Sequence, residues 1–293
     1  VQVTGLVGQF GQVISVVPFA WLVRSAGWSP GFLGLAGGTV FIAVLAWVAM
    51  ADDGHHLAGS ADLRRRVARS WAEPGTRMAF WTHFVSPFAA NAFGVLWGYP
   101  FLVHAQGLSG SAAQAILTVF VAFGIIAGPI VGALSARFAD HRVLIVLGVV
   151  GAQLVVWSVV IALPGPAPLW LLVVLAATIC AGGPTSVMAF DMARDHNPVE
   201  RLSTATGIVN GAGFLATVLV VLGIGVILQL TPSTGVEYGF DSFRWAMAIQ
   251  VPFWILGSVM VVAEHRRTRL RSTDSDDGSP TQSGLRRPRN VLS

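Results

Sequence analysis

Eight long apolar runs constrain the fold of this chain more than any other feature of its sequence. A helix that crosses the hydrocarbon core of a bilayer needs about 20 mostly apolar residues. The chain has 293 residues, of which 54% are apolar and 11% are charged, whereas soluble domains carry about 25% charged residues. We therefore predict an all-α fold, a polytopic membrane helix bundle of about eight transmembrane helices. The predicted spans are 3–23, 31–50, 79–103, 113–135, 143–163, 168–189, 205–229 and 245–263.

The positive charges lie on one side of these spans. Sixteen of the 18 arginines fall in the alternate connections 51–78, 136–142 and 190–202 or in the C-terminal tail, and the other connections hold only Arg24 and Arg244. Positively charged connections stay on the cytoplasmic side of a membrane. We therefore expect a multi-pass protein of the plasma membrane whose long loop and tail are cytoplasmic. This placement explains the net positive charge without a nucleic-acid partner.

A short motif follows the fourth apolar run. Residues 132–142 read Gly-Ala-Leu-Ser-Ala-Arg-Phe-Ala-Asp-His-Arg. The segment resembles the cytoplasmic loop motif of the major facilitator superfamily, which has a glycine, an Asp-Arg pair, a second glycine and two basic residues. The matching residues are Gly132, Arg137 and Arg142, while Ala136 and Ala139 stand at the positions of the acid and the second glycine.

The resemblance implies a numbering of the spans. In that family the motif lies between helices 2 and 3 and recurs between helices 8 and 9, so the spans resemble helices 5 to 12 of an N-terminally truncated member. Residues 1–50 are then the last two helices of the N-terminal half, and 51–78 are the loop between the halves. Residues 79–264 are the C-terminal six-helix half, and 265–293 are a disordered, basic cytoplasmic tail, because their Ser, Asp, Arg, Pro and Gly residues cannot bury a core.

The resemblance also implies a function. Members of this family are secondary carriers in which two helix bundles rock about a central site near the bilayer midplane. We expect this chain, as a fragment of such a carrier, to move a small organic solute by alternating access. The expected partners are the lipid bilayer, a small-molecule substrate and a coupling ion bound by the missing helices. The resemblance implies no cofactor and no metal.

Polar residues at membrane depth are the candidate substrate-binding residues. Asn91 and Asn210 lie near the middle of their spans, and a polar group at that depth should face the bundle interior. Each could bind substrate or form a hydrogen bond to a neighbouring helix, and the sequence leaves both roles open. His83 and Trp81, about one turn inside the span 79–103, are further candidates for a substrate-binding or an interfacial role.

Acidic residues are missing from the middle of every predicted span. Proton-coupled carriers usually need a titratable group within the membrane, so we expect either that this group lies in the missing helices 1 to 4 or that coupling is not by proton. The single cysteine, Cys180, excludes an internal disulfide and a metal site built from several thiolates.

One predicted span contains a helix-breaking sequence. The triplet Gly182-Gly183-Pro184 lies within 168–189, and a proline removes a backbone hydrogen bond and kinks a helix. We predict a helix bend at these residues, either functional or simply accommodated by packing.

Glycines at four-residue spacing predict close contacts between helices. Such spacing places small residues on one helix face, where two backbones can approach closely in lipid. The glycines concerned are Gly34, Gly38, Gly124, Gly128, Gly132, Gly207 and Gly211.

Two other functions stay open. A membrane-embedded enzyme would need a cluster of reactive side chains at a membrane face, and two candidate clusters exist. Both are also typical of solvated or salt-bridged loops, so we expect a protein that is not an enzyme. The third possibility is a truncated membrane remnant without function. The clusters are Asp52, Asp53, His55 and His56, and Asp191, Arg194, Asp195 and His196.

Overall fold

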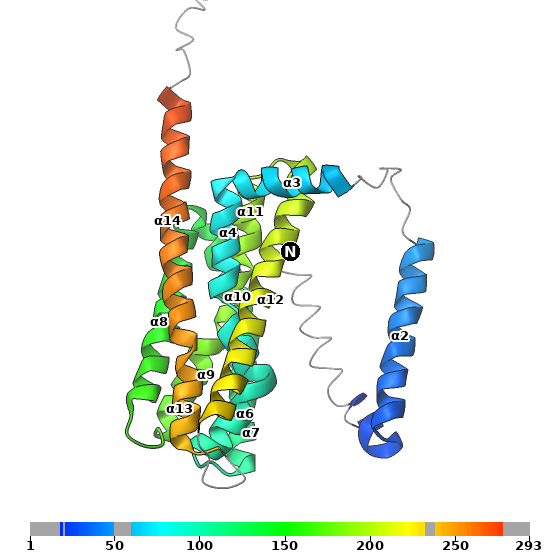
Figure 1. Ribbon diagram of the computed structural model, residues 1–293, viewed down its shortest axis with the longest axis vertical. Helices are drawn as coiled ribbons and strands as arrows, with labels where there is room; N and C mark the ends of the chain where they lie inside the picture. Colours follow the sequence, from blue (N-terminus) through cyan, green and yellow to red (C-terminus); the bar gives the residue numbers. More distant parts are fainter. Residues whose placement is uncertain (1–17, 20, 50–59, 232–237, 278–293) are drawn as a thin grey trace, which may run out of the picture. The chain divides into compact units, whose positions relative to one another are not determined.

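Helices are the only regular secondary structure in the described part of the chain. The computed structural model shows no strand in these residues, which confirms the predicted all-α helix bundle (Figure 1). The chain divides into two compact units, Val1–Arg66 and Val67–Ser293, and each is described by itself below. The residues described are 18–19, 21–49, 60–231 and 238–277.

The first unit is built around helix α2 (Trp28–Ala49). Gly27 precedes the helix with a φ of +91°, a conformation that favours glycine. Trp28 stacks near Phe32, with 4.7 Å between the ring centroids. Most other side chains are exposed, including Trp47, which is 85% exposed. A helix that is apolar on all sides is one that lipid or other helices cover.

The second unit is a bundle in which α4 lies between α12 and α14, and α14 also contacts α8 (Figure 1). Three of its helical segments are continuous, and three change direction or helix type along their length. The elements are α3 (Ser60–Ala72, which extends from the first unit), α4 (Pro74–Val85), α5 (Phe88–Asn91), η1 (Ala92–Trp97), α6 (Gly98–Pro100), η2 (Phe101–Ala105), α7 (Gly110–Arg137), η3 (Ala139–His141), α8 (Arg142–Ala162), α9 (Leu169–Cys180), α10 (Gly182–Ser186), α11 (Met188–Asp195), α12 (Val199–Leu230), α13 (Phe240–Ala248) and α14 (Gln250–Asp277).

Six helices in the described residues are long and apolar enough to cross a membrane. This number differs from the predicted eight for two reasons. The predicted span 3–23 lies almost wholly outside the described residues, and the predicted span 79–103 is not one continuous helix. The six candidates are Trp28–Ala49, Gly110–Arg137, Ala139–Ala162, Leu169–Asp195, Val199–Leu230 and Phe240–Arg271.

The continuous helices begin and end where local chemistry allows it. The hydroxyl of Ser109 caps α7 by accepting a hydrogen bond from the Ala112 amide at 3.3 Å. Pro198 is extended and precedes the first turn of α12. The prolines at 164, 166 and 168 follow α8 and keep the chain non-helical until α9 begins.

The segment 74–105 contains wider helical turns. Both η1 and η2 are π-helical, and the Gly98 amide donates to the carbonyl of Phe93, five residues earlier. A side chain at Gly98 would collide with that carbonyl oxygen, so glycine permits the wide turn. Pro100 has no amide hydrogen to continue a regular ladder. Wide turns of this kind interrupt helices and are frequent at functional sites.

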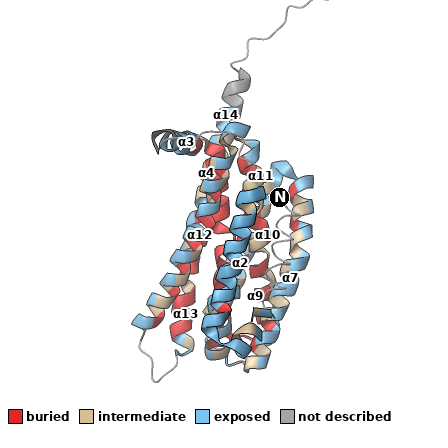
Figure 2. Ribbon diagram, turned by 90° about the vertical axis from the view of Figure 1, so that its right-hand side faces the viewer, coloured by how far each residue is buried: buried red, intermediate tan, exposed pale blue. Residues whose placement is uncertain are grey.

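Buried tryptophans tie three helical segments together in the core. The indole nitrogen of Trp157 on α8 donates to the Met247 carbonyl of α13 at 3.2 Å. The indole nitrogen of Trp254 on α14 donates to Gln153 Oε1 on α8 at 3.2 Å, and Gln153 in turn donates to the Thr178 carbonyl of α9 at 3.3 Å. Each buried polar atom in this chain of contacts therefore has a partner. Figure 2 shows buried, intermediate and exposed positions along the helices of the bundle.

Two segments are more helical than we expected. Helix α3 lies inside the predicted loop 51–78. The segment is helical because Leu63, Val67 and Trp71 recur every four residues and give it an apolar face. Helix α14 continues to Asp277, beyond residue 265 where we expected a disordered tail. Its extension is supported by the Arg267–Glu264 ion pair at 2.7 Å. Residues 278–293 of the expected tail lie outside the described residues.

Candidate functional site

Asn91 contacts the middle of α12. It ends α5 in a partly buried position, and its amide nitrogen donates to the hydroxyl of Thr217 at 3.1 Å. The Thr217 hydroxyl donates in turn to the Gly213 carbonyl of its own helix at 2.8 Å. Asn91 and Thr217 therefore form a neutral, hydrogen-bonded bridge between α5 and α12.

Asn210 lies on the same face of α12 as Thr217. Residues seven positions apart are separated by about two helical turns and share a face, which also brings Ser203 into line. Ser203 and Asn210 are exposed on the surface of the unit, whereas Thr217 is half-buried. We name Asn91, Ser203, Asn210 and Thr217 the polar stripe. Sequence reasoning missed Thr217 and Ser203, although their spacing of seven residues from Asn210 could have identified them.

His83 has a different environment from the polar stripe. It is buried, its Nδ1 atom lies 3.0 Å from the Ser186 carbonyl oxygen, and its ring centroid lies 4.9 Å from that of Phe190. A Cβ atom added to Gly213 would lie 2.8 Å from the His83 ring. His83 therefore fills the space between α10, α11 and α12.

Trp81 is half-buried among aromatic side chains. Its ring centroid lies 5.3 Å from that of Phe80 and 5.2 Å from that of Phe84. The structure thus joins Asn91 to the α12 face that carries Asn210, and it places Trp81 in a ring cluster on α4.

The Gly182-Gly183-Pro184 segment forms the short helix α10 between two interruptions, at Ala181 and Val187. Gly182 packs so closely against the Ser86 carbonyl that a side chain there would collide with it. Gly183 has no neighbouring atom within 4 Å of an added Cβ in the described residues. Pro184 is buried, and the Thr185 amide donates to the Ala181 carbonyl at 3.1 Å.

The loop motif makes its contacts at one end of the bundle, the upper end in Figure 1, which we name the basic end. Arg142 Nε donates to the Ser135 carbonyl at 3.2 Å and to the Ser135 hydroxyl at 3.1 Å, and its Nη1 forms an ion pair with Asp195 of α11. The guanidinium of Arg137 lies 5.5 Å from the ring centroid of Phe138, and Gly132 lies one turn before Ser135 in α7.

Acids on α11 are the partners of the loop motif. Asp195 pairs with Arg142, and Asp191 accepts a hydrogen bond from the Ser135 hydroxyl at 3.1 Å and lies 3.7 Å from Arg194. The motif position 136 holds alanine, so this charged contact uses an acid from a different helix. The sequence showed the α11 acids as a cluster but could not show which loop they reach.

A second charged group joins the start of α4 to α14 at the basic end. Glu264 is buried, with Arg77 Nε at 3.0 Å from one carboxylate oxygen and Arg267 Nη1 at 2.7 Å from the other. Arg77 also donates to the carbonyls of Trp71 and Ala72 at 2.9 and 3.0 Å. The carboxylate is thus fully matched by guanidinium donors, which a buried charge requires.

The clusters that an enzyme could use are either undescribed or occupied by structural contacts. Asp52, Asp53, His55 and His56 lie outside the described residues. In the other cluster, Asp191 and Asp195 make the contacts given above, and His196 Nδ1 lies 2.8 Å from the Met192 carbonyl oxygen. Among the described residues, no group of three or more His, Cys, Asp or Glu side chains could hold a metal ion.

Comparison with protein families gives a match. A family model described as Major Facilitator Superfamily matches residues 79–292, which is well over half of the chain. No curated protein matches the chain. The matched segment contains the polar stripe, the loop motif and most of the second unit.

Proposed function

The chain belongs to the major facilitator superfamily, a family of secondary transporters of small solutes, and we propose that it moves a small organic solute across the plasma membrane by alternating access. In this proposal residues 79–264 act as the C-terminal six-helix half of the carrier, and 1–50 contribute two helices to the other half. The basic end, with loop 51–78 and the tail, faces the cytoplasm because of its arginines.

The observation that carries the proposal is the exposed position of the polar stripe. Asn210 and Ser203 are exposed on α12, one of the most apolar helices of the chain. An amide that faced lipid would lack a hydrogen-bond partner, which costs free energy. The stripe therefore fits a surface that faces a water-filled cavity or another helix bundle, as the central site of an alternating-access carrier does.

The chemistry of the stripe suggests a class of substrate. Amide and hydroxyl groups donate and accept hydrogen bonds without carrying charge. They suit the hydroxyl and carbonyl groups of a neutral organic solute such as a sugar derivative. We assign Asn91 and Asn210 to substrate binding. Trp81 and His83 lie on α4, toward the cytoplasmic end of the predicted span that contains Asn91, and we assign them to support that end.

Two further features are proposed to change during transport. The contacts of Arg142 with Ser135 and Asp195 hold α7, α8 and α11 together at the basic end, and we assign them to one of the two access states. We also propose that the interrupted segment around Gly182 and Pro184 bends when the protein passes from one access state to the other. Neither needs the acid that position 136 lacks.

Uptake by proteoliposomes tests this proposal. The purified protein is reconstituted and presented with labelled neutral solutes, and the product is recovered to check that it is chemically unchanged. For the solute that enters, Asn210→Ala should raise KM about tenfold, the effect of losing about 1.4 kcal/mol of hydrogen bonding. Val218→Ala, at another exposed position on α12, is the matched control and should leave KM unchanged.

Two outcomes would contradict the proposal. Conversion of a solute without its uptake would indicate a membrane enzyme. Uptake that is equally insensitive to Asn210→Ala and Val218→Ala would show that the polar stripe does not contact the substrate.

A further inference from the structure

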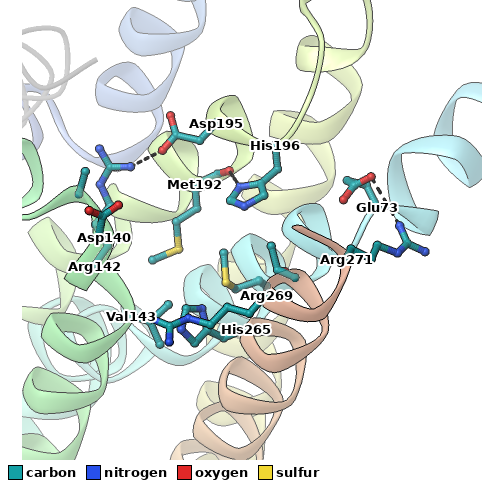
Figure 3. A pocket seen from close by; sticks show the side chains of 13 residues that line it. Glu73, Asp140, Arg142, Val143, Met192, Asp195, His196, His265, Arg269 and Arg271 are labelled. Atoms are coloured by element: carbon teal, nitrogen blue, oxygen red, sulfur yellow. Dashed lines mark hydrogen bonds and ion pairs between the residues drawn. The ribbon is translucent and has the colours of Figure 1, made fainter. Parts of the chain in front are cut away.

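A cavity of about 710 Å³ opens at the basic end of the second unit. Four helical segments surround it, and Figure 3 shows His265 and Arg269 of α14 beside Val143 of α8. The lining combines charged side chains with two methionines. The residues are Glu73, Met78, Ala139, Asp140, Arg142, Val143, Met192, Asp195, His196, His265, Thr268, Arg269 and Arg271.

A second, apolar hollow continues from this cavity. It has a volume of about 400 Å³, lies between α8 and α14, and shares Asp140, Val143, His265 and Arg269 with the first. Away from the shared residues, its lining combines His141 and Arg266 with an apolar wall. The apolar wall residues are Leu144, Leu147 and Val262, and Leu144 is 65% exposed. A charged compartment therefore leads directly into an apolar groove on the outer surface of two membrane-spanning helices.

The charges around the two hollows favour an anion. The walls carry four arginines against three acids, and two of the acids already face a lining arginine: Asp195 pairs with Arg142, and Glu73 lies 3.8 Å from Arg271. Arg269 and the remaining acid, Asp140, line both hollows, and Arg266 lines the second. The other titratable groups of the walls are His141, His196 and His265.

We propose that the cavity and the groove together bind one anionic glycerophospholipid of the adjoining leaflet. The phosphodiester lies at the junction, where Arg266 and Arg269 supply planar guanidinium donors that match phosphate oxygens. The rest of the headgroup occupies the cavity, and an acyl chain lies along Leu144, Leu147 and Val262. Basic pockets between membrane helices are known to bind lipid headgroups.

The apolar groove distinguishes a lipid from a free anion. Inorganic phosphate would bind the arginines and leave the groove empty. A phospholipid would bind the arginines through its phosphate and would also cover the apolar surface of the groove with an acyl chain. A zwitterionic lipid would make the same acyl-chain contacts in the groove but would be attracted less strongly by the arginines. The site therefore selects both for negative charge and for an attached acyl chain.

Native mass spectrometry of the purified protein tests the site without any transport assay. The protein in detergent is titrated with phosphatidylglycerol or with phosphatidylcholine of the same acyl chains, and the retained one-lipid adducts are compared. We expect phosphatidylglycerol to be retained at about tenfold lower concentration. The variant R266Q/R269Q should weaken its retention about thirtyfold, because one arginine contributes about fivefold.

Matched variants separate the site from general charge and general lipid contact. The single change Arg201→Gln on α12 removes a positive charge away from the hollows and should leave retention unchanged. Leu144→Trp fills the groove and should weaken retention about tenfold, whereas Ile130→Trp, at an exposed position of α7, should have no effect.

The proposal fails under three results. Equal retention of the two lipids would remove the anionic selectivity. Complete displacement of phosphatidylglycerol by millimolar inorganic phosphate would indicate a free-anion site instead. Equal effects of Leu144→Trp and Ile130→Trp would show that the acyl chain does not occupy the groove.

Discussion

The basic end and the middle of the second unit are held together by different forces. The ion pairs of the described residues at the basic end include Arg77–Glu264 and Arg142–Asp195. In the middle, the helices are joined by neutral hydrogen bonds such as Asn91–Thr217 and by close packing at Gly182 and Gly213. Charges are costly where water is absent. The chain therefore keeps ion pairs at the membrane boundary and uses shape and neutral donors at depth.

Glu264→Gln should have the largest effect on stability. It removes the carboxylate that Arg77 and Arg267 contact and leaves Arg77 beside an uncharged partner. Breaking a buried ion pair costs about 3 kcal/mol or more, and we expect about 3 because Arg77 keeps its two carbonyl acceptors. The measurement is the free energy of unfolding in mixed micelles.

Arg267→Gln is the control for this prediction. The Arg267 side chain is 62% exposed, so losing its ion pair should cost about 0.5 kcal/mol. Similar small losses for both variants would show that the basic end does not depend on a buried charge.

Gly182→Ala should have the next largest effect and tests the middle of the unit. The added methyl group would meet the Ser86 carbonyl, which is backbone and cannot rotate away. Overpacking of this kind costs about 1–3 kcal/mol. Gly211→Ala is the matched change, because the described residues place no atom within 4 Å of the new methyl group, and it should not destabilise. Equal changes in the free energy of unfolding for Gly182→Ala and Gly211→Ala would refute close packing at Gly182.

The Asn91–Thr217 bond should contribute less. Hydrogen bonds between membrane helices are worth about 0.6 kcal/mol on average. A double-mutant cycle with Asn91→Ala and Thr217→Val, read from unfolding in micelles, should give a coupling free energy of about this size. A coupling free energy of zero would mean that the two side chains are energetically independent. It would contradict a hydrogen-bonded bridge between α5 and α12.

Arg194→Gln should have the smallest effect. Its guanidinium lies 3.7 Å from Asp191 and is 53% exposed, so water and salt screen the pair and the expected loss is below about 0.5 kcal/mol. The thermal midpoint should move little at low salt and not at all in 0.5 M salt. A larger, salt-independent loss would mean that the basic end relies on this exposed pair as well.

The sequence predicted best the parts of the fold where one property dominates. The runs 113–135, 143–163 and 205–229 differ by a few residues from Gly110–Arg137, Arg142–Ala162 and Val199–Leu230. In these helices, uninterrupted apolar composition is sufficient to specify a span. The span 79–103 was harder, because its wide turns arise from the local contacts of Gly98 and Pro100 rather than from hydrophobicity.

Contacts between helices were largely inaccessible to sequence reasoning. Four-residue spacing identified Gly207 and Gly211, yet no atom of the described residues lies within 4 Å of a Cβ added there. The close approaches instead occur at Gly182, Gly213 and Gly257. Spacing shows that glycines share a helix face, but only the crossing of two helices decides which face is in contact.

The same limit applied to the candidate site. Asn91 and Asn210 were selected by depth alone, and Thr217 joined them only when α5 and α12 were placed side by side. The acid opposite the loop motif was present as Asp195 in the sequence, but its contact with Arg142 joins residues more than fifty positions apart.

The hydrogen-bonded tryptophans of the core differ sharply in exposure from other tryptophans of the second unit. Trp157 and Trp254 are at most 1% exposed, whereas Trp170 and Trp245 are 66% and 65% exposed on the surface of the unit. Lipids with brominated acyl chains quench the fluorescence only of indoles that they touch. Emission from Trp157 and Trp254 should therefore survive in such a bilayer, and its colour and lifetime would report on whether the joint between α8, α13 and α14 stays dry.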